Sequence, residues 1–254
     1  MKKLLLILFL LIAQFLSSAQ CYESLKYIKR VFNPDRDNKI YRRERLFQFD
    51  YQYTKGDTSY RVVIAPGKDF YLVPESVVDD YLYSVKQISF KVIKPKLFQR
   101  TSRYQSETLT TYDPLLTKAW QGLVDNKHNV WLHPPRVYLF RILELNPFPY
   151  IKYPLAVGKQ WTDSLSIGDH WSDPRWKVWK GRILNQYTYR VMGQTSISIL
   201  GTTIPCWIIQ ASAKSSLGTT QLVSYFNEEY GFVQMDYINI DESRITLKLH
   251  RLPI

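Results

Sequence analysis

The sequence has few of the residues on which metal, redox and nucleophile chemistry depend. Only two of its 254 residues are cysteines and only four are histidines. No C-x-x-C, H-E-x-x-H or H-x-H spacing occurs, which removes the common zinc motifs. The G-x-S-x-G, P-loop and dinucleotide-binding patterns are also absent. The sequence therefore predicts no metal, no cofactor and no catalytic residue, and it favours a protein that is not an enzyme.

One short segment gathers residues of the kinds that bind metals. Asp169, His170 and Asp173 lie within six consecutive positions, but their spacing fits a polar loop better than a metal site. A hydrolase that uses His133 or His170 stays a minor alternative, because no nucleophile motif accompanies either histidine.

Long apolar runs are missing too. A membrane-spanning helix needs about 20 apolar residues, whereas the run Leu4–Ala13 is much shorter. It follows Lys2 and Lys3 and leads to small residues ending at Ala19. This pattern predicts a signal peptide over residues 1–20, cleaved after Ala19 or Gln20. Its S-A-Q ending resembles signal peptides of the Bacteroidetes phylum, so we expect export to the periplasm or the extracellular space.

The first cysteine directly follows the predicted signal peptide. A lipid anchor on Cys21 is an alternative, disfavoured because Gln20 stands where lipoprotein processing requires a small residue. In an oxidising compartment Cys21 could instead form a disulfide with Cys206, provided that the two Cα atoms approach within about 6 Å. Cys206 lies in an apolar segment, so a buried free thiol is an equal alternative.

Acidic residues are in deficit. The chain carries 34 Lys and Arg against 22 Asp and Glu, a net charge of +12, which falls by two units if Lys2 and Lys3 leave with the signal peptide. Such a surface can bind nucleic acid, anionic headgroups or acidic glycans. Export argues against nucleic acid, and any membrane contact is expected to be peripheral. The sequence sets no oligomeric state.

Long amphipathic helical patterns are also lacking, and alternating strand patterns take their place. Leu46–Tyr53 alternates with aromatics on one side, and short apolar segments separated by turn residues follow from Gln160 onward. This rhythm predicts a mainly β fold with few short helices: an antiparallel curved sheet or half-open barrel, with an additional β-rich N-terminal half. Locally, Pro114 predicts the start of a short helix, and Arg175–Arg182 predicts a strand.

A proline-rich stretch, Trp131–Trp161, separates two differently patterned halves. We interpret it as the seam of one β-rich body. The predicted organisation is a signal peptide over 1–20, a β-rich N-terminal half over 21–146 and an antiparallel β domain over 147–254.

The C-terminal half carries an ordered set of motifs. They are Y-P-L-A-V-G-K-Q-W (Tyr153–Trp161), Y-R-V-M-G (Tyr189–Gly193), L-G-T-T-I-P-C-W-I-I (Leu200–Ile209) and Y-F-N-E-E-Y-G-F-V-Q-M-D-Y (Tyr225–Tyr237). This order resembles bacterial envelope proteins of the DUF3108-like group, distantly akin to the half-barrel lipoprotein carriers of the LolA/LolB type. The resemblance implies a fold and a compartment, and no catalytic residues.

The most unusual polar group surrounds a Pro–Pro pair. His133 and Arg136 flank the pair, between the aromatic residues Trp131 and Tyr138. Two prolines stiffen the backbone, so these four residues are the predicted ligand-binding site, in which His133 and Arg136 grip an anionic group. The alternative is a structural corner in which Arg136 pairs with a carboxylate such as Glu144.

Two functions are compatible with these features. The first is an exported, non-enzymatic β protein that binds or carries an apolar or amphipathic envelope component, such as a lipid, in the concave face of its sheet. The alternative is a surface module that recognises a protein or glycan through exposed aromatic residues, with Trp176 and Trp179 as candidates.

Overall fold

Strands dominate the structure, a computed structural model that describes residues 34–65, 69–77, 83–94 and 104–253. The predicted signal peptide and Cys21 lie outside these residues. In chain order the elements are α2 (Pro34–Asp37), β1 (Leu46–Lys55), β2 (Thr58–Ile64), β3 (Phe70–Pro74), β4 (Gln87–Ile93), β5 (Ser106–Asp113), β6 (Leu115–Asp125), β7 (Asn129–Leu132), the 3₁₀ helix η2 (Tyr138–Leu145), β8 (Tyr150–Lys152), β9 (Gln160–Gly168), the 3₁₀ turn η3 (Asp169–Trp171), β10 (Arg182–Ile199), β11 (Thr202–Ser215), β12 (Gly218–Asn227), β13 (Gly231–Ile238) and β14 (Arg244–Leu249).

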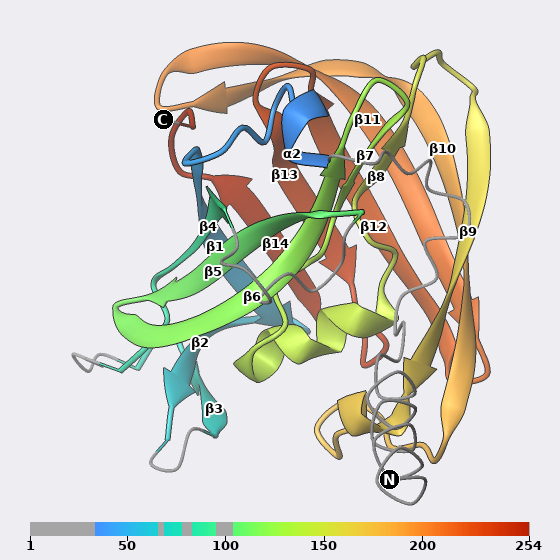
Figure 1. Cartoon of the computed structure of the whole chain (residues 1–254). Coiled ribbons are helices and arrows are strands. Elements are labelled where there is room, and N and C mark those ends of the chain that lie inside the picture. Colours follow the sequence, from blue (N-terminus) through green and yellow to red (C-terminus); the bar gives the residue numbers. More distant parts are fainter. Residues whose placement is uncertain (1–33, 66–68, 78–82, 95–103, 254) are drawn as a thin grey trace, which may run out of the picture.

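All the strands belong to one antiparallel sheet. Its order is β8-β7-β6-β5-β4-β1-β14-β13-β12-β11-β10-β9, with β2 and β3 branching from β1. The sheet curves strongly around η2 (Figure 1), which confirms the predicted fold class. Because β1 pairs with β14, the two predicted halves share this sheet. The proposed division at residues 146 and 147 falls just after η2 and stays a prediction.

Two local predictions are wrong. The segment after Pro114 is not a helix but the strand β6, which pairs with β5 over most of its length; a short isolated helix is only marginally stable, because its first turn is costly to form. The segment Arg175–Arg182 is mainly a loop, and only its last residue begins β10. A single isolated bridge, between Asp173 and Lys177, closes that loop at its start.

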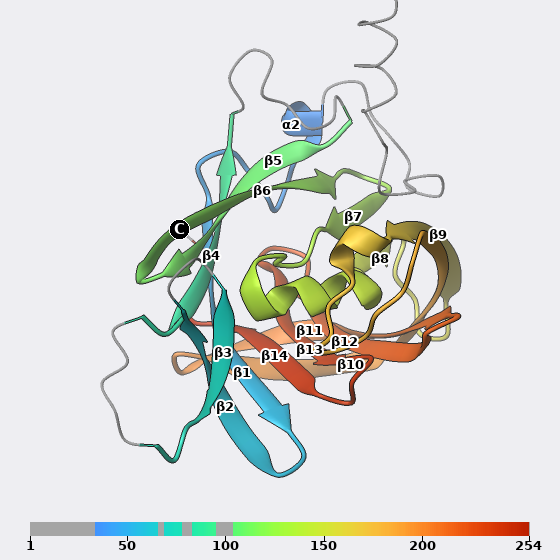
Figure 2. The same ribbon diagram turned by 90° about the horizontal axis from the view of Figure 1, so that it is seen from below.

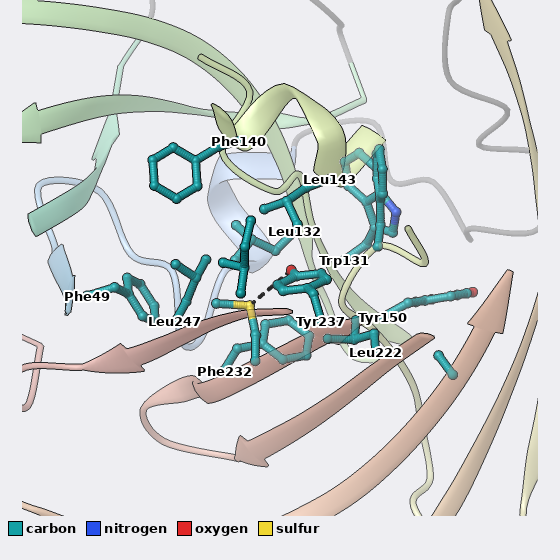
Figure 3. Packing of buried hydrophobic residues seen from close by; sticks show 14 of the residues in the cluster. Phe49, Trp131, Leu132, Phe140, Leu143, Tyr150, Leu222, Phe232, Tyr237 and Leu247 are labelled. Carbon is teal, nitrogen blue, oxygen red and sulfur yellow. Dashed lines mark hydrogen bonds between the residues drawn. The ribbon is translucent and has the colours of Figure 1, made fainter. Parts of the chain in front are cut away.

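The proline-rich seam fills the concave face of the sheet. In Figure 2, η2 lies between the β4–β6 layer and the strands β11–β14. Seven of its eight residues are buried, and Arg141 is the exception. Leu143 points toward Phe232 and Tyr237 of the opposite layer, whereas the Phe140 ring lies on the side of Phe49 and Leu247 (Figure 3) and contacts the rings of Tyr51 and Tyr112. The interior that was expected to hold a ligand is therefore occupied largely by the chain itself.

Hydrogen bonds fix the C-terminal end of η2. The Leu145 carbonyl oxygen accepts bonds from Asn185 Nδ2 on β10 and Thr220 Oγ1 on β12, both at 2.8 Å. Asn146 Nδ2 donates to the carbonyl oxygens of Gln221 and Ile238. The last carbonyls of a helix lack partners within it, so these side chains join η2 to three strands. Within the described residues, no helix is both long and apolar enough to cross a bilayer.

A carboxylate ties the segment before β1 to the sheet. Asp125 Oδ2 accepts bonds from the backbone N–H groups of Lys39, Ile40 and Tyr41 at 2.7–2.9 Å. Burial raises the pKa of this carboxyl, although these three N–H groups oppose the shift. The partners of Asp125 lie more than 80 positions away, so nothing in the local sequence marks this role.

The hairpin β10–β11 extends past both neighbouring strands. β9 pairs with β10 only as far as Arg190, and β12 pairs with β11 only as far as Trp207. At its tip, Leu200 has φ 45° and Gly201 has φ 81°, the left-handed pair that a tight hairpin turn requires. The Leu200 side chain is 74% exposed, so its burial offsets little of the backbone strain.

Replacing Leu200 by Asn is expected to stabilise the protein. Asn adopts left-handed backbone with less strain than Leu, so the free energy of unfolding should rise by about 0.5–1 kcal/mol. Chemical denaturation measures this change. Leu184→Asn is the matched control, because Leu184 is also exposed but lies in regular strand; it should give no gain. Equal effects of the two substitutions would contradict the assignment of strain to the tip.

The thiol of Cys206 is expected to resist alkylation. It is buried, it donates to the Ile204 carbonyl oxygen at 3.6 Å, and burial raises its pKa to about 11. Because the thiolate is the reactive form, iodoacetamide at pH 8 should leave Cys206 unmodified until denaturant is added. Mass spectrometry without reductant measures this. If adducts appear in denaturant only after reduction, Cys206 is instead part of a disulfide, for which Cys21 is the candidate partner.

Candidate functional site

The four residues predicted to bind a ligand lie close together, but only one of them reaches the surface. Trp131 ends up in β7, Tyr138 opens η2, and His133 and Arg136 lie in the link between these elements. Trp131, His133 and Tyr138 are buried, whereas Arg136 is half-buried. The aromatic pair therefore holds the corner in place, and Arg136 is the member that can meet a ligand.

Hydrogen bonds organise this corner. His133 Nδ1 lies 2.8 Å from the Pro134 carbonyl oxygen, and its Nε2 lies 3.3 Å from Arg136 Nη1. A guanidinium group only donates, so His133 Nε2 accepts that bond and Nδ1–H donates to Pro134. Arg136 Nη2 also donates to the Trp120 carbonyl oxygen at 2.8 Å.

The predicted partner carboxylate lies at the same corner. Glu144 Oε1 is 3.4 Å from His133 Nε2, and both side chains are buried. Glu144 comes from η2, and because His133 Nε2 accepts from Arg136, this close approach of Glu144 Oε1 is packing of two buried side chains and not a hydrogen bond between these two atoms. The structural alternative and the binding hypothesis thus describe one cluster, with Glu144 on its inner side and Arg136 on its outer side.

A hollow of about 350 Å³ opens beside this cluster, and we call it the η2 pocket. Such a volume is at the small end of the range for ligand sites. The polar lining comes from the seam and from η3, and the apolar lining comes from the inward face of β9 and from Trp171. Its lining residues are Arg136, Glu144, Leu165, Ser166, Ile167, His170 and Trp171.

Three arginines set the electrostatics of the η2 pocket. The pKa of His170 is lowered, first by burial and then by Arg141, with smaller effects from Arg182 and Arg136, while Asp169 opposes the shift. Arg141 Nη2 donates to the His170 carbonyl oxygen at 2.6 Å, and its guanidinium lies 5.7 Å from the ring centre of Trp171. A neutral imidazole among guanidinium groups favours an anionic ligand group over a cationic one.

The acidic residues near His170 are engaged elsewhere. Asp169 Oδ2 accepts the Gly181 N–H at 2.7 Å, and Asp173 forms an ion pair with Arg175 at 2.6 Å. Among the described residues, no group of three or more His, Cys, Asp or Glu side chains is arranged to hold a metal ion.

The two tryptophans expected at the surface point inward. Trp176 and Trp179 are only 6% and 8% exposed. Trp176 stacks on Phe70 with 6.4 Å between ring centres, and the Arg175 guanidinium lies 3.8 Å from the Phe70 ring centre. Both rings turn inward from the loop, while the residues between them, Lys177 and Val178, are exposed. The prediction that these two side chains recognise a partner is wrong.

Sequence reasoning missed several lining residues of the η2 pocket. Glu144 was considered only as a structural partner of Arg136, although it lines the pocket, and Arg141, which bonds the lining residue His170, was not considered. Arg141 and Glu144 are the two charged residues of the otherwise apolar Tyr138–Leu145, and charges in such a segment could have signalled a site. Leu165 and Ile167 carried no signal beyond strand alternation. The sequence marked His170 only as a weak metal-ligand candidate, whereas in the structure it lines the η2 pocket and its carbonyl oxygen accepts a bond from Arg141.

The inward row of β9 continues from the pocket to an aromatic cluster. Trp161 stacks on Tyr189 with 5.4 Å between ring centres, and Tyr150 meets both rings edge-on. Asp163 lies between this cluster and Leu165 in the same row, and it is 7% exposed. Burial raises its pKa to about 6, against smaller opposing effects of the Ser164 N–H and Lys152.

Stability is expected to fall as the pH rises through the pKa of Asp163. The folded state holds this proton up to about pH 6, whereas the unfolded chain loses it near pH 4. Between these values the folded state binds more protons, so the free energy of unfolding decreases by up to about 2–3 kcal/mol. Chemical denaturation from pH 4 to pH 8 measures the slope. Asp163→Asn should flatten it, and Asp57→Asn, in an exposed turn, should not; equal slopes in wild type and Asp163→Asn would contradict the assignment.

Comparison with known proteins gives likeness of fold only. No protein-family model and no curated protein sequence matches the chain. A lipoprotein candidate from Parabacteroides distasonis is 11% identical, with 88% of this chain and 98% of that chain covered and a TM-score of 0.45. An exported-protein candidate from Bacteroides fragilis with a YmcC-like fold is 8% identical, with 88% and 99% covered and a TM-score of 0.43.

The hypothetical lipoprotein YmcC from Escherichia coli is 10% identical, with 81% of this chain and 83% of that chain covered and a TM-score of 0.34. The three proteins are thus described as lipoproteins or exported proteins. At these identities and TM-scores, the function of this chain has to be argued from its own geometry. The resemblance to DUF3108-like and LolA/LolB proteins stays a prediction.

Proposed function

We propose that this chain is an exported, non-enzymatic protein of the bacterial envelope that binds a small amphipathic anion in the η2 pocket. The signal-peptide pattern of residues 1–20 supports export. The observation that carries the binding proposal is the pocket itself, in which the guanidinium group of Arg136 and the imidazole of His170 share the lining with apolar side chains of β9. This places the ligand at the end of the curved sheet, beside η2, instead of along the filled concave face.

The charge distribution supports an anionic ligand group. Arg136 lines the pocket, and Arg141 and Arg182 lie near enough to His170 to lower its pKa. Guanidinium groups form strong, directional hydrogen bonds with carboxylates and phosphates. The buried Glu144 lies on the inner side, where it opposes deep entry of a second negative charge. We therefore expect one anionic group at the mouth of the pocket.

The apolar lining supports an amphipathic ligand body. Leu165 and Ile167 alternate into the pocket from β9, and Trp171 closes one side from η3. Small-molecule sites generally combine such apolar walls with a few polar groups that orient the ligand. A short alkyl chain or a ring system with a single carboxylate or phosphate fits this arrangement.

The proposal predicts that dodecanoate binds, and that a ligand with only its carboxylate or only its alkyl chain binds much more weakly. Isothermal titration calorimetry at low salt should show binding of dodecanoate, with acetate and dodecan-1-ol at least about ten-fold weaker, because each lacks one of the two contacts. Arg136→Gln and Arg141→Gln should each weaken dodecanoate about ten-fold. Arg244→Gln on β14 is the control, since this exposed arginine does not line the pocket, and it should change nothing.

Two outcomes would contradict the proposal. Equal affinity for dodecanoate and dodecan-1-ol would mean that the arginines do not recognise the anionic group. Binding that survives both Arg136→Gln and Arg141→Gln would place the ligand elsewhere on the protein. Thermal unfolding of each variant shows whether it is folded, and Arg136→Lys keeps the charge if Arg136→Gln is not.

A further inference from the structure

The loop that follows η3 presents an unusual combination of residues, and we call residues 172–182 the Trp176 loop. Trp176 and Trp179 are buried, while Lys177, Val178 and Lys180 are exposed. The Val178 side chain is 63% exposed. The buried rings thus fix the loop to the body of the protein, and an apolar side chain between two lysines faces solvent.

The Trp176 loop is held in one conformation by many contacts. The backbone N–H groups of Trp176 and Lys177 donate to the Asp173 carbonyl oxygen at 3.1 and 2.9 Å. Arg175 bonds Asp173 and also Asp69, beyond the loop, at 2.6–2.8 Å. At the other end, the Gly181 N–H donates to Asp169. The exposure of Val178 is therefore part of a built surface.

The Trp176 loop is rich in basic residues, and the two exposed carboxylates beside it, Asp69 and Asp169, are bonded to Arg175 and to the Gly181 N–H. No acidic residue occurs from Pro174 to Arg182, and Asp173 at the start of the loop is buried against Arg175. Lys177, Lys180 and Arg182 all have exposed side chains. On the outer face of β10, Leu184 adds a second apolar side chain that is 54% exposed. Basic residues interspersed with exposed apolar ones are typical of proteins that bind anionic lipid surfaces.

The Trp176 loop adjoins the η2 pocket. Arg182 Nε donates to Ser166 Oγ at 2.9 Å, and its Nη2 donates to the Ser166 carbonyl oxygen at 3.1 Å. Ser166 lines the pocket, as does Trp171, the residue directly before the loop. A flat anionic surface in contact with Lys177, Val178 and Lys180 therefore meets the protein at the same end as the pocket.

We infer that the Trp176 loop docks the protein onto an anionic lipid bilayer. In the docked state, Val178 enters the headgroup region, and Lys177 and Lys180 contact lipid phosphates. The docking itself follows from the loop. The added statement that the pocket then receives an amphipathic anion from the bilayer rests on the proposed function. Attraction of the lysines to anionic lipids and burial of the apolar side chain at the interface each strengthen such binding.

Vesicle co-sedimentation of the purified exported chain tests the docking. Vesicles of phosphatidylcholine and phosphatidylglycerol should bind the protein, vesicles of phosphatidylcholine alone should not, and added salt should release it. Lys177→Gln with Lys180→Gln should weaken binding about ten-fold or more, at roughly five-fold for each charge. Val178→Ser should also weaken it. The control is Lys214→Gln with Lys248→Gln, two exposed lysines on β11 and β14, which should leave binding unchanged.

Three results would overturn the inference. The first is binding to neutral and anionic vesicles alike, and the second is binding that the Lys177 and Lys180 substitutions leave unchanged. The third is retention on heparin without vesicle binding, which would identify an acidic glycan as the partner. Dodecanoate titration separates the two proposals, because the loop substitutions should not change its affinity in solution. Loss of vesicle binding with intact dodecanoate binding supports both the docking surface and the separate pocket.

Discussion

Filling the concave side of a strongly curved sheet is the constraint on which the rest of this structure depends. A sheet that bends around itself exposes a row of inward side chains from every strand, and water has to be excluded from them. The eight residues of η2 fill that space, and Leu145 and Asn146 bond to strands β10, β12 and β13. The pocket exists where this filling ends, between η2 and the last inward residues of β9.

The strand pattern was readable because burial alternates with a period of two. In β10 the outward and inward residues alternate from Arg182 to Val191, and the sequence shows the same rhythm. Two segments escaped this reasoning. Pro114 is a residue that opens both helices and turns, so β6 could not be assigned from local pattern alone. Tyr138–Leu145 carries its two charges three positions apart, as on one face of a helix, but eight residues are too few for that pattern to stand out.

The candidate site was predictable only in part. The Pro–Pro pair correctly marked a rigid corner at which His133 and Arg136 meet. The wall opposite comes from β9 and η3, about 30 positions further along the chain, and nothing local relates those segments to the corner. The tryptophans of the Trp176 loop show the converse error. Composition indicated aromatic residues at a surface, but burial of large rings is the more favourable outcome, and Lys177, Val178 and Lys180 remained exposed.

The pairing of β1 with β14 has a consequence for how the chain reaches this state. Residues 49–54 pair with residues 244–249, a separation that covers nearly all of the described chain. Contacts so distant in sequence make folding slow, because a large loop must close before they form. A polypeptide synthesised from its N-terminus cannot complete this sheet until β14 has emerged. Under the proposed export, such delayed closure would leave time for the chain to be threaded, still unfolded, across a membrane.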